Sequence, residues 1–222
     1  MPPLLFDIAH LLAAGMLIVS FLLLYQDRAS ATLNAFALQA ILLSFAVAWQ
    51  AYIQDAPHLI FVAMIALVLN GFILPTALHR IVRRLGIHRD IELAIGRGPT
   101  MLIGFGLVAL SAVLILPAGH GAGLISREGL AFALAVVLLG MLMMVARRNA
   151  VAQIVSFMSL ENGLVLAVSG AKGMPLVVEI SVALSILMIV MVFGVFAFPV
   201  RERYDAVDVS ALHRLRGERA DV

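Results

Sequence analysis

Cysteine is absent from the 222 residues of this chain, and only 13% of the residues are charged. Without cysteine the chain can form no disulfide, thiolate zinc site, iron–sulfur cluster or cysteine-bound nickel site. A soluble domain carries about 25% charged residues, whereas here 63% of the residues are hydrophobic and the mean hydropathy is +1.09. The composition excludes a soluble enzyme and indicates an all-α, polytopic membrane protein.

Seven apolar stretches have the length of a transmembrane helix. Roughly 17–25 helical residues cross a hydrocarbon layer of about 30 Å. We predict spans at 4–25, 32–53, 58–80, 99–117, 127–146, 150–169 and 175–198. Only Pro75 falls inside a span, where its missing N–H frees the carbonyl of Gly71 and predicts a kink beside Asn70.

The basic residues predict the orientation of these spans. If the N-terminus lies outside and the C-terminus in the cytoplasm, thirteen of the fifteen lysines and arginines face the cytoplasm, and only Arg127 and Lys172 lie outside. This bias predicts an N-out, C-in protein of the inner (cytoplasmic) membrane. The net charge of +2 therefore reflects membrane orientation, and no nucleic-acid partner is expected.

The spans divide the chain into three predicted regions. Residues 1–98 form a three-helix membrane region with a cytoplasmic basic loop, 99–198 a four-helix membrane region, and 199–222 a charged cytoplasmic tail. Within the loop, 81–98 mixes arginines with spaced Leu and Ile. An interfacial amphipathic turn and a solvated basic loop explain this pattern equally well.

Two carboxyl groups lie inside predicted spans, where an ionised side chain is costly. Glu161 lies in the sixth span, and Glu179 lies near the outer end of the seventh. Such a group must pair with another helix, meet water, or carry a proton. Two carboxyls on consecutive helices predict a proton path, and the alternative is a neutral acid that hydrogen-bonds two helices together.

Several amides also lie within the spans. Asn70 and Asn162 are candidate polar relay residues, although interhelical packing is the favoured explanation for both, as it is for Gln39. A kink at Asn70 that holds water is the alternative. No two histidines lie on facing mid-membrane turns, so neither haem, another cofactor nor a bound metal is expected.

The last third of the chain carries a recognisable pattern. The runs Ala146-Arg147-Arg148-Asn149 and Leu160-Glu161-Asn162-Gly163 resemble the Arg-Arg-Asn…Leu-Glu…Asn pattern of the K-type subunit of respiratory complex I, and Glu179-Ile180-Ser181-Val182-Ala183-Leu184 is similar to its Glu-x-Ser-x-x-Leu. Over nearly its full length the chain resembles the membrane component E of hydrogenase-4 and formate hydrogenlyase complexes. Further similar stretches are Leu38-Gln39-Ala40, Ile73-Leu74-Pro75, Leu176-Val177-Val178-Glu179-Ile180 and Val207-Asp208-Val209-Ser210-Ala211-Leu212.

The resemblance implies a subunit without a catalytic site of its own. Glu161 and Glu179 would transfer protons, or hydrate a polar axis, between antiporter-like and complex-I-like membrane subunits and, indirectly, a peripheral redox arm. The family pattern has a lysine where this chain has Asn70, and an aspartate after Glu179 where it reads Leu184-Ser185-Ile186-Leu187. Two other functions remain open: a self-sufficient ion or small-solute transporter, and a purely structural membrane anchor.

Overall fold

The computed structural model describes residues 3–85, 96–117, 124–170, 183–192 and 194. The chain divides into two compact units, Met1–Ile186 and Leu187–Val222. In the second unit the described residues are 187–192 and 194. The described parts of the chain contain helices and no strands, which confirms the all-helical prediction.

The helical elements follow the predicted spans closely. They are α1 (Pro3–Tyr25), α2 (Ala29–Gln54), α3 (Pro57–Ala66), the π-helix η1 (Leu67–Ile73), α4 (Leu74–Leu85), α5 (Arg97–Ile115), α6 (Leu124–Ala146) and α7 (Ala150–Ser169). With α3, η1 and α4 taken as one continuous helix, the described residues hold six helices long and apolar enough to cross a membrane. The chain therefore has the architecture of a polytopic membrane protein.

The seventh predicted span, 175–198, lies only partly within the described residues. Its described portion includes a ten-residue apolar helix, Ala183–Val192. Pro175 and Glu179 lie outside the described residues. The count of seven spans and the N-out, C-in orientation thus stay predictions.

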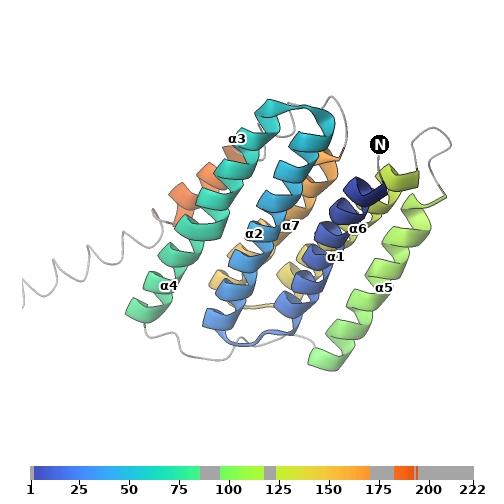
Figure 1. Cartoon of the computed structure of the whole chain (residues 1–222). Coiled ribbons are helices and arrows are strands. Elements are labelled where there is room, and N and C mark those ends of the chain that lie inside the picture. Colours follow the sequence, from blue (N-terminus) through green and yellow to red (C-terminus); the bar gives the residue numbers. More distant parts are fainter. Residues whose placement is uncertain (1–2, 86–95, 118–123, 171–182, 193, 195–222) are drawn as a thin grey trace, which may run out of the picture. The chain divides into compact units, whose positions relative to one another are not determined.

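In the first unit, α2 lies among more neighbouring elements than any other described helix (Figure 1). Helix α2 packs against α1, α3, η1, α4 and α7, and α6 packs against α1, α5 and α7. Among the described spans α7 and α2 are the most buried and α5 the least. Helices of the predicted 1–98 and 99–198 regions therefore share one unit, because α1 contacts α6 and α2 contacts α7.

Two glycines allow α6 and α7 to approach closely. A Cβ atom at Gly140 would lie 2.8 Å from the backbone nitrogen of Leu160, and a Cβ atom at Gly163 would lie 2.9 Å from the backbone nitrogen of Val137. Real Cβ atoms do not approach backbone so closely, so both positions require glycine unless the helices separate. Small residues at helix contacts are the usual means of close packing in membranes.

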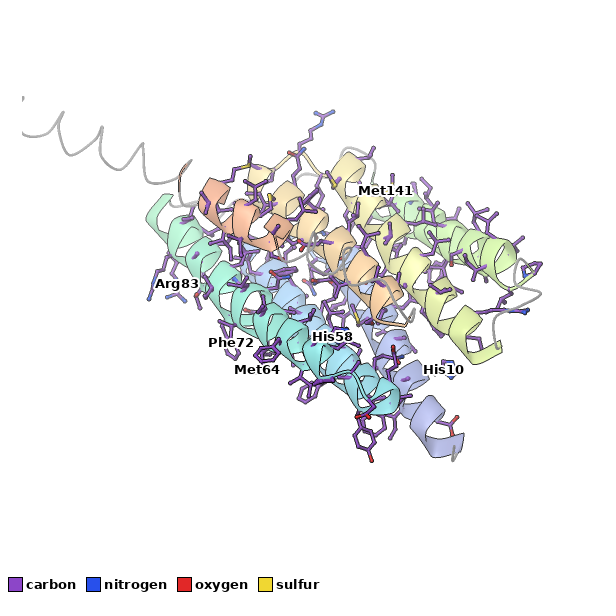
Figure 2. The ribbon with its side chains drawn as sticks, turned by 90° about the horizontal axis from the view of Figure 1, so that it is seen from above. His10, His58, Met64, Phe72, Arg83 and Met141 are labelled. Atoms are coloured by element: carbon purple, nitrogen blue, oxygen red, sulfur yellow. The ribbon has the colours of Figure 1, made fainter. Side chains whose placement is uncertain are left out.

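The helix that contains Pro75 extends from Pro57 to Leu85, beyond the predicted end at residue 80. Directly before Pro75 the helix contains the π-helix η1, after which the N–H of Leu74 donates to the carbonyl of Leu69, five residues back. The kink predicted beside Asn70 stays a prediction. Met64 and Phe72 project outward from this segment (Figure 2), whereas Asn70 and Gly71 are buried. Of the 81–98 segment, the first five residues continue α4, and 86–95 lie outside the described residues.

Candidate functional site

Glu161 is buried in the middle of α7, with 1% of its surface exposed. One carboxyl oxygen, Oε1, accepts a hydrogen bond of 2.5 Å from the hydroxyl of Ser185, on the Ala183–Val192 helix. The other oxygen, Oε2, is buried and has no hydrogen-bond partner within the described part of the chain. A carboxyl group that is only half satisfied therefore lies between two helices, at a depth where burying a polar group is costly.

The next residue of α7, Asn162, belongs to a network of buried amides and hydroxyls. Its Nδ2 donates to Oε1 of Gln39 on α2 at 3.3 Å, and its Oδ1 accepts from Nδ2 of Asn70 on η1 at 3.3 Å. Nε2 of Gln39 in turn donates to the hydroxyls of Ser20 on α1 at 2.8 Å and of Ser159 on α7 at 2.9 Å. This amide network, Ser20, Gln39, Asn70, Ser159 and Asn162, joins four helical elements.

The structure brings some of the predicted site residues together and separates others. Asn70 and Asn162 form a direct hydrogen bond. Glu161 precedes Asn162, and because consecutive helical residues point about 100° apart, Glu161 contacts Ser185 while Asn162 contacts α2 and η1. Glu179 lies outside the described residues, so its part in a proton path with Glu161 stays a prediction.

The hydroxyl partners of these side chains are not evident from the sequence. The sequence predicts Gln39 as an amide within a span, but it predicts neither the central position of Gln39 in the network nor the contacts of Ser20, Ser159 and Ser185. One signal was present, because Ser159 lies three residues before Asn162 and therefore on the same face of α7. No local pattern indicates that Ser20 or Ser185 would face these residues from other helices.

The start of α7 is fixed by side chains in the short turn after α6. Oδ1 of Asn149 accepts a hydrogen bond of 2.9 Å from the backbone N–H of Val151, which caps the helix. Nε2 of Gln153 donates to the carbonyl of Arg147 at 3.2 Å. These contacts, with the glycine packing between α6 and α7, set the position from which Glu161 and Asn162 project.

Arg147, the first residue after α6, is almost completely buried, with 1% exposure. Its guanidinium donates to backbone carbonyls at the end of α1, namely those of Leu23, Leu24 at 3.4 Å and Gln26 at 2.9 Å, and to the hydroxyl of Thr32 at 3.5 Å. Burial lowers the pKa of Arg147 from its ordinary value to about 10, so the group stays a cation at neutral pH. A cation is favourable here because the last carbonyls of a helix carry partial negative charge.

Ionic contacts link the helix ends. Asp27, after α1, pairs with Arg97 at the start of α5, and His10 on α1 lies 3.3 Å from Glu128 on α6, nitrogen to oxygen. Figure 2 shows His10 near one end of its helix. The described residues contain no group of three or more histidines and carboxylates that could hold a metal ion.

Comparison with known proteins gives a similarity over most of the chain. The chain matches no protein-family model and no solved structure. It is 27% identical over 206 residues to the uncharacterized protein Rv0085 of Mycobacterium tuberculosis, a match that covers 92% of this chain and 94% of that protein. This chain is therefore similar to the mycobacterial protein along nearly the whole length of both.

Proposed function

We propose that this chain is a non-catalytic membrane subunit of a complex-I-like assembly of the hydrogenase-4 or formate hydrogenlyase type, and that Glu161 takes part in its proton translocation. The observation that carries the proposal is the buried carboxyl of Glu161, which has one oxygen bonded to Ser185 and the other without a described partner. A carboxyl group at membrane depth is a functional candidate by default. The resemblance of the 146–163 segment to the K-type subunit supports the same role.

The chemistry of the Glu161–Ser185 contact suits proton exchange. A hydroxyl group can donate to an ionised carboxylate and can also accept from a protonated one, so Ser185 can remain bonded in both states. The second oxygen, Oε2, is open to a water molecule or to a group on a neighbouring subunit. The redox chemistry of such an assembly is assigned to its other subunits, because cofactors carry that chemistry and this chain lacks the cysteines that hold most metal clusters.

The two alternatives explain the same carboxyl differently. A self-sufficient transporter would also bury an acidic group, but it should be active as a single chain. A structural anchor would use Glu161 only as a hydrogen-bonding group between α7 and the helix that carries Ser185. The observed hydrogen bond is compatible with both alternatives, so the test must separate proton exchange from bonding.

Glu161→Gln makes that separation. Glutamine has nearly the same size and can hydrogen-bond Ser185, but it cannot take up and release a proton. In vesicles that hold the whole complex, we expect Glu161→Gln to lower proton pumping per turnover while subunit content stays normal. Glu128→Gln is the matched control, because Glu128 has 54% side-chain exposure and should tolerate the change. Normal pumping in an assembled Glu161→Gln complex would refute the proton role and favour the anchor.

Purification tests the partner class. A tagged chain extracted gently from its native membrane should bring with it large antiporter-like membrane subunits and a hydrogenase-like or dehydrogenase-like peripheral arm. The purified single chain in liposomes should show no ion flux of its own. Flux from the single chain, abolished by Glu161→Gln, would support the transporter instead.

A further inference from the structure

The hydrogen bonds of the amide network have a fixed direction. The hydroxyl of Ser20 lies 2.8 Å from the carbonyl oxygen of Met16, which can only accept, so Ser20 must donate its single hydrogen there. Ser20 can then meet Gln39 only as an acceptor. The amide nitrogen of Gln39, and not its oxygen, must therefore face Ser20.

This direction passes along every amide in turn. Because its nitrogen is directed at Ser20 and Ser159, Gln39 presents its oxygen to Asn162. Asn162 must therefore donate from Nδ2. Asn162 then presents Oδ1 to Asn70, which must answer with Nδ2. The last atom of the network is consequently Oδ1 of Asn70, which is an acceptor. The hydrogen bonds fix this result, however the oxygen and nitrogen of each amide are first assigned.

This terminal acceptor is unsatisfied among the described residues. Asn70 is 2% exposed, and its Oδ1 has no hydrogen-bond partner within the described part of the chain. Buried polar groups almost always have partners, and an unpaired one is commonly explained by an ordered water or ion. Lipid cannot supply a donor at this depth.

The backbone beside Asn70 adds a second acceptor. Pro75 has no N–H, so one carbonyl of the preceding turn lacks its helical donor: that of Asn70 at π spacing, or that of Gly71 at α spacing. Both residues are buried. The side-chain oxygen and the freed carbonyl therefore belong to the same turn of the helix, and both require a donor.

We propose that η1 binds a water molecule that donates to Oδ1 of Asn70 and to the carbonyl freed by Pro75. Water fits because it carries two donor hydrogens for two acceptors, and a buried water is normally held by two to four polar groups. The inference goes beyond the proposed function, because it follows from the hydrogen-bond direction and holds whether or not Glu161 exchanges protons.

Solid-state NMR on the asparagine-labelled full chain in lipid bilayers tests this proposal directly. The chain has four asparagines, at positions 34, 70, 149 and 162, and water-edited spectra report which side chains lie beside water. Asn162 is an internal control, because both ends of its amide are bonded to protein. We expect magnetisation to pass from water to the side chain of Asn70 several-fold faster than to the side chain of Asn162. Equally slow transfer to both would overturn the proposal.

Two further measurements keep the result interpretable. Pro75→Ala restores a backbone N–H for the freed carbonyl, so transfer to Asn70 should fall, whereas Pro57→Ala at the start of α3 should leave it unchanged because no carbonyl is freed there. If magnetisation transfer to Asn70 is unchanged in Pro75→Ala, the backbone carbonyl does not bind the water. Replacing sodium by choline should not move the Asn70 side-chain signal; a clear shift would mean that a cation, and not water, occupies the site.

Discussion

Arg147, the residue that follows α6, donates a 2.9 Å hydrogen bond to the backbone carbonyl of Gln26, the residue that follows α1. The same guanidinium reaches two carbonyls in the last turn of α1. One buried cation therefore caps a helix more than a hundred residues earlier in the chain. Arg148, its neighbour, is exposed.

The first prediction compares these two arginines. Arg147→Met should lower the free energy of unfolding by about 3 kcal/mol, because hydrogen bonds to charged groups are worth roughly 1.5–3 kcal/mol and several helix-end carbonyls would lose their donor. Arg148→Met removes the same charge from an exposed side chain and should change stability by less than about 0.5 kcal/mol. Equilibrium unfolding of both variants in mixed micelles checks this. Equal losses would contradict a specific role for Arg147.

The contribution of Arg147 should be independent of pH near neutrality. Burial lowers its pKa to about 10, so the group is protonated in both folded and unfolded chains below about pH 9. Above that range the unfolded chain binds more protons, and this group alone makes stability rise with pH. The stability difference between the unmodified chain and Arg147→Met should thus be flat from pH 5 to 8. A clear slope in that range would count against the assignment.

The close contact between α6 and α7 predicts a difference among glycines. Gly140→Ala and Gly163→Ala place a Cβ atom against backbone, and each should cost about 1–3 kcal/mol, as overpacking does. A Cβ atom at Gly106 on α5 meets nothing within 4 Å, so Gly106→Ala should be neutral or stabilising by up to about 1 kcal/mol. Thermal unfolding in one detergent compares all three. A harmless Gly163→Ala would show that the helices separate easily.

The direction of the amide network predicts which side chains position 70 accepts. Asn162 presents an acceptor there, so residue 70 must supply a donor. Asn70→Lys keeps a donor and should fold, whereas an ionised Asn70→Asp places acceptor against acceptor and should lose about 1–3 kcal/mol. The loss should shrink as the pH falls, because a protonated acid regains a donor. Unfolding midpoints at two pH values test this; an Asp variant as stable as the Lys variant would contradict the direction.

The predicted orientation is testable because the chain has no cysteine of its own. Single substitutions His120→Cys and Lys172→Cys should react in intact cells with a thiol reagent that cannot cross the membrane. Asp90→Cys should react only after the membrane is permeabilised. The physical reason is the excess of arginine on the predicted cytoplasmic side. Outside labelling at position 90 would reverse the topology.

Some of the site could be predicted because the sequence shows which polar residues lie within long apolar runs, and hence inside a span. Glu161, Asn70 and Asn162 stand out as polar residues within long apolar runs, and the structure finds all three buried. The partners could not be predicted in the same way. Ser20 and Ser185 resemble many other serines in helices, and only packing brings their hydroxyls to Gln39 and Glu161.

The sequence by itself determined that this is an all-helical chain with membrane-length spans, because the lengths of its apolar runs and its few charges leave little else. It also predicted a kink beside Asn70, since Pro75 lacks an N–H, whereas the π-helix at this place was found only in the structure. Only the tertiary structure distinguished Arg147 from Arg148, which are identical in type and adjacent in the chain. The turn after α6 directs one side chain into the bundle, where it bonds the carbonyls of α1, and the other outward. Such a difference arises from packing between distant helices, which no local pattern encodes.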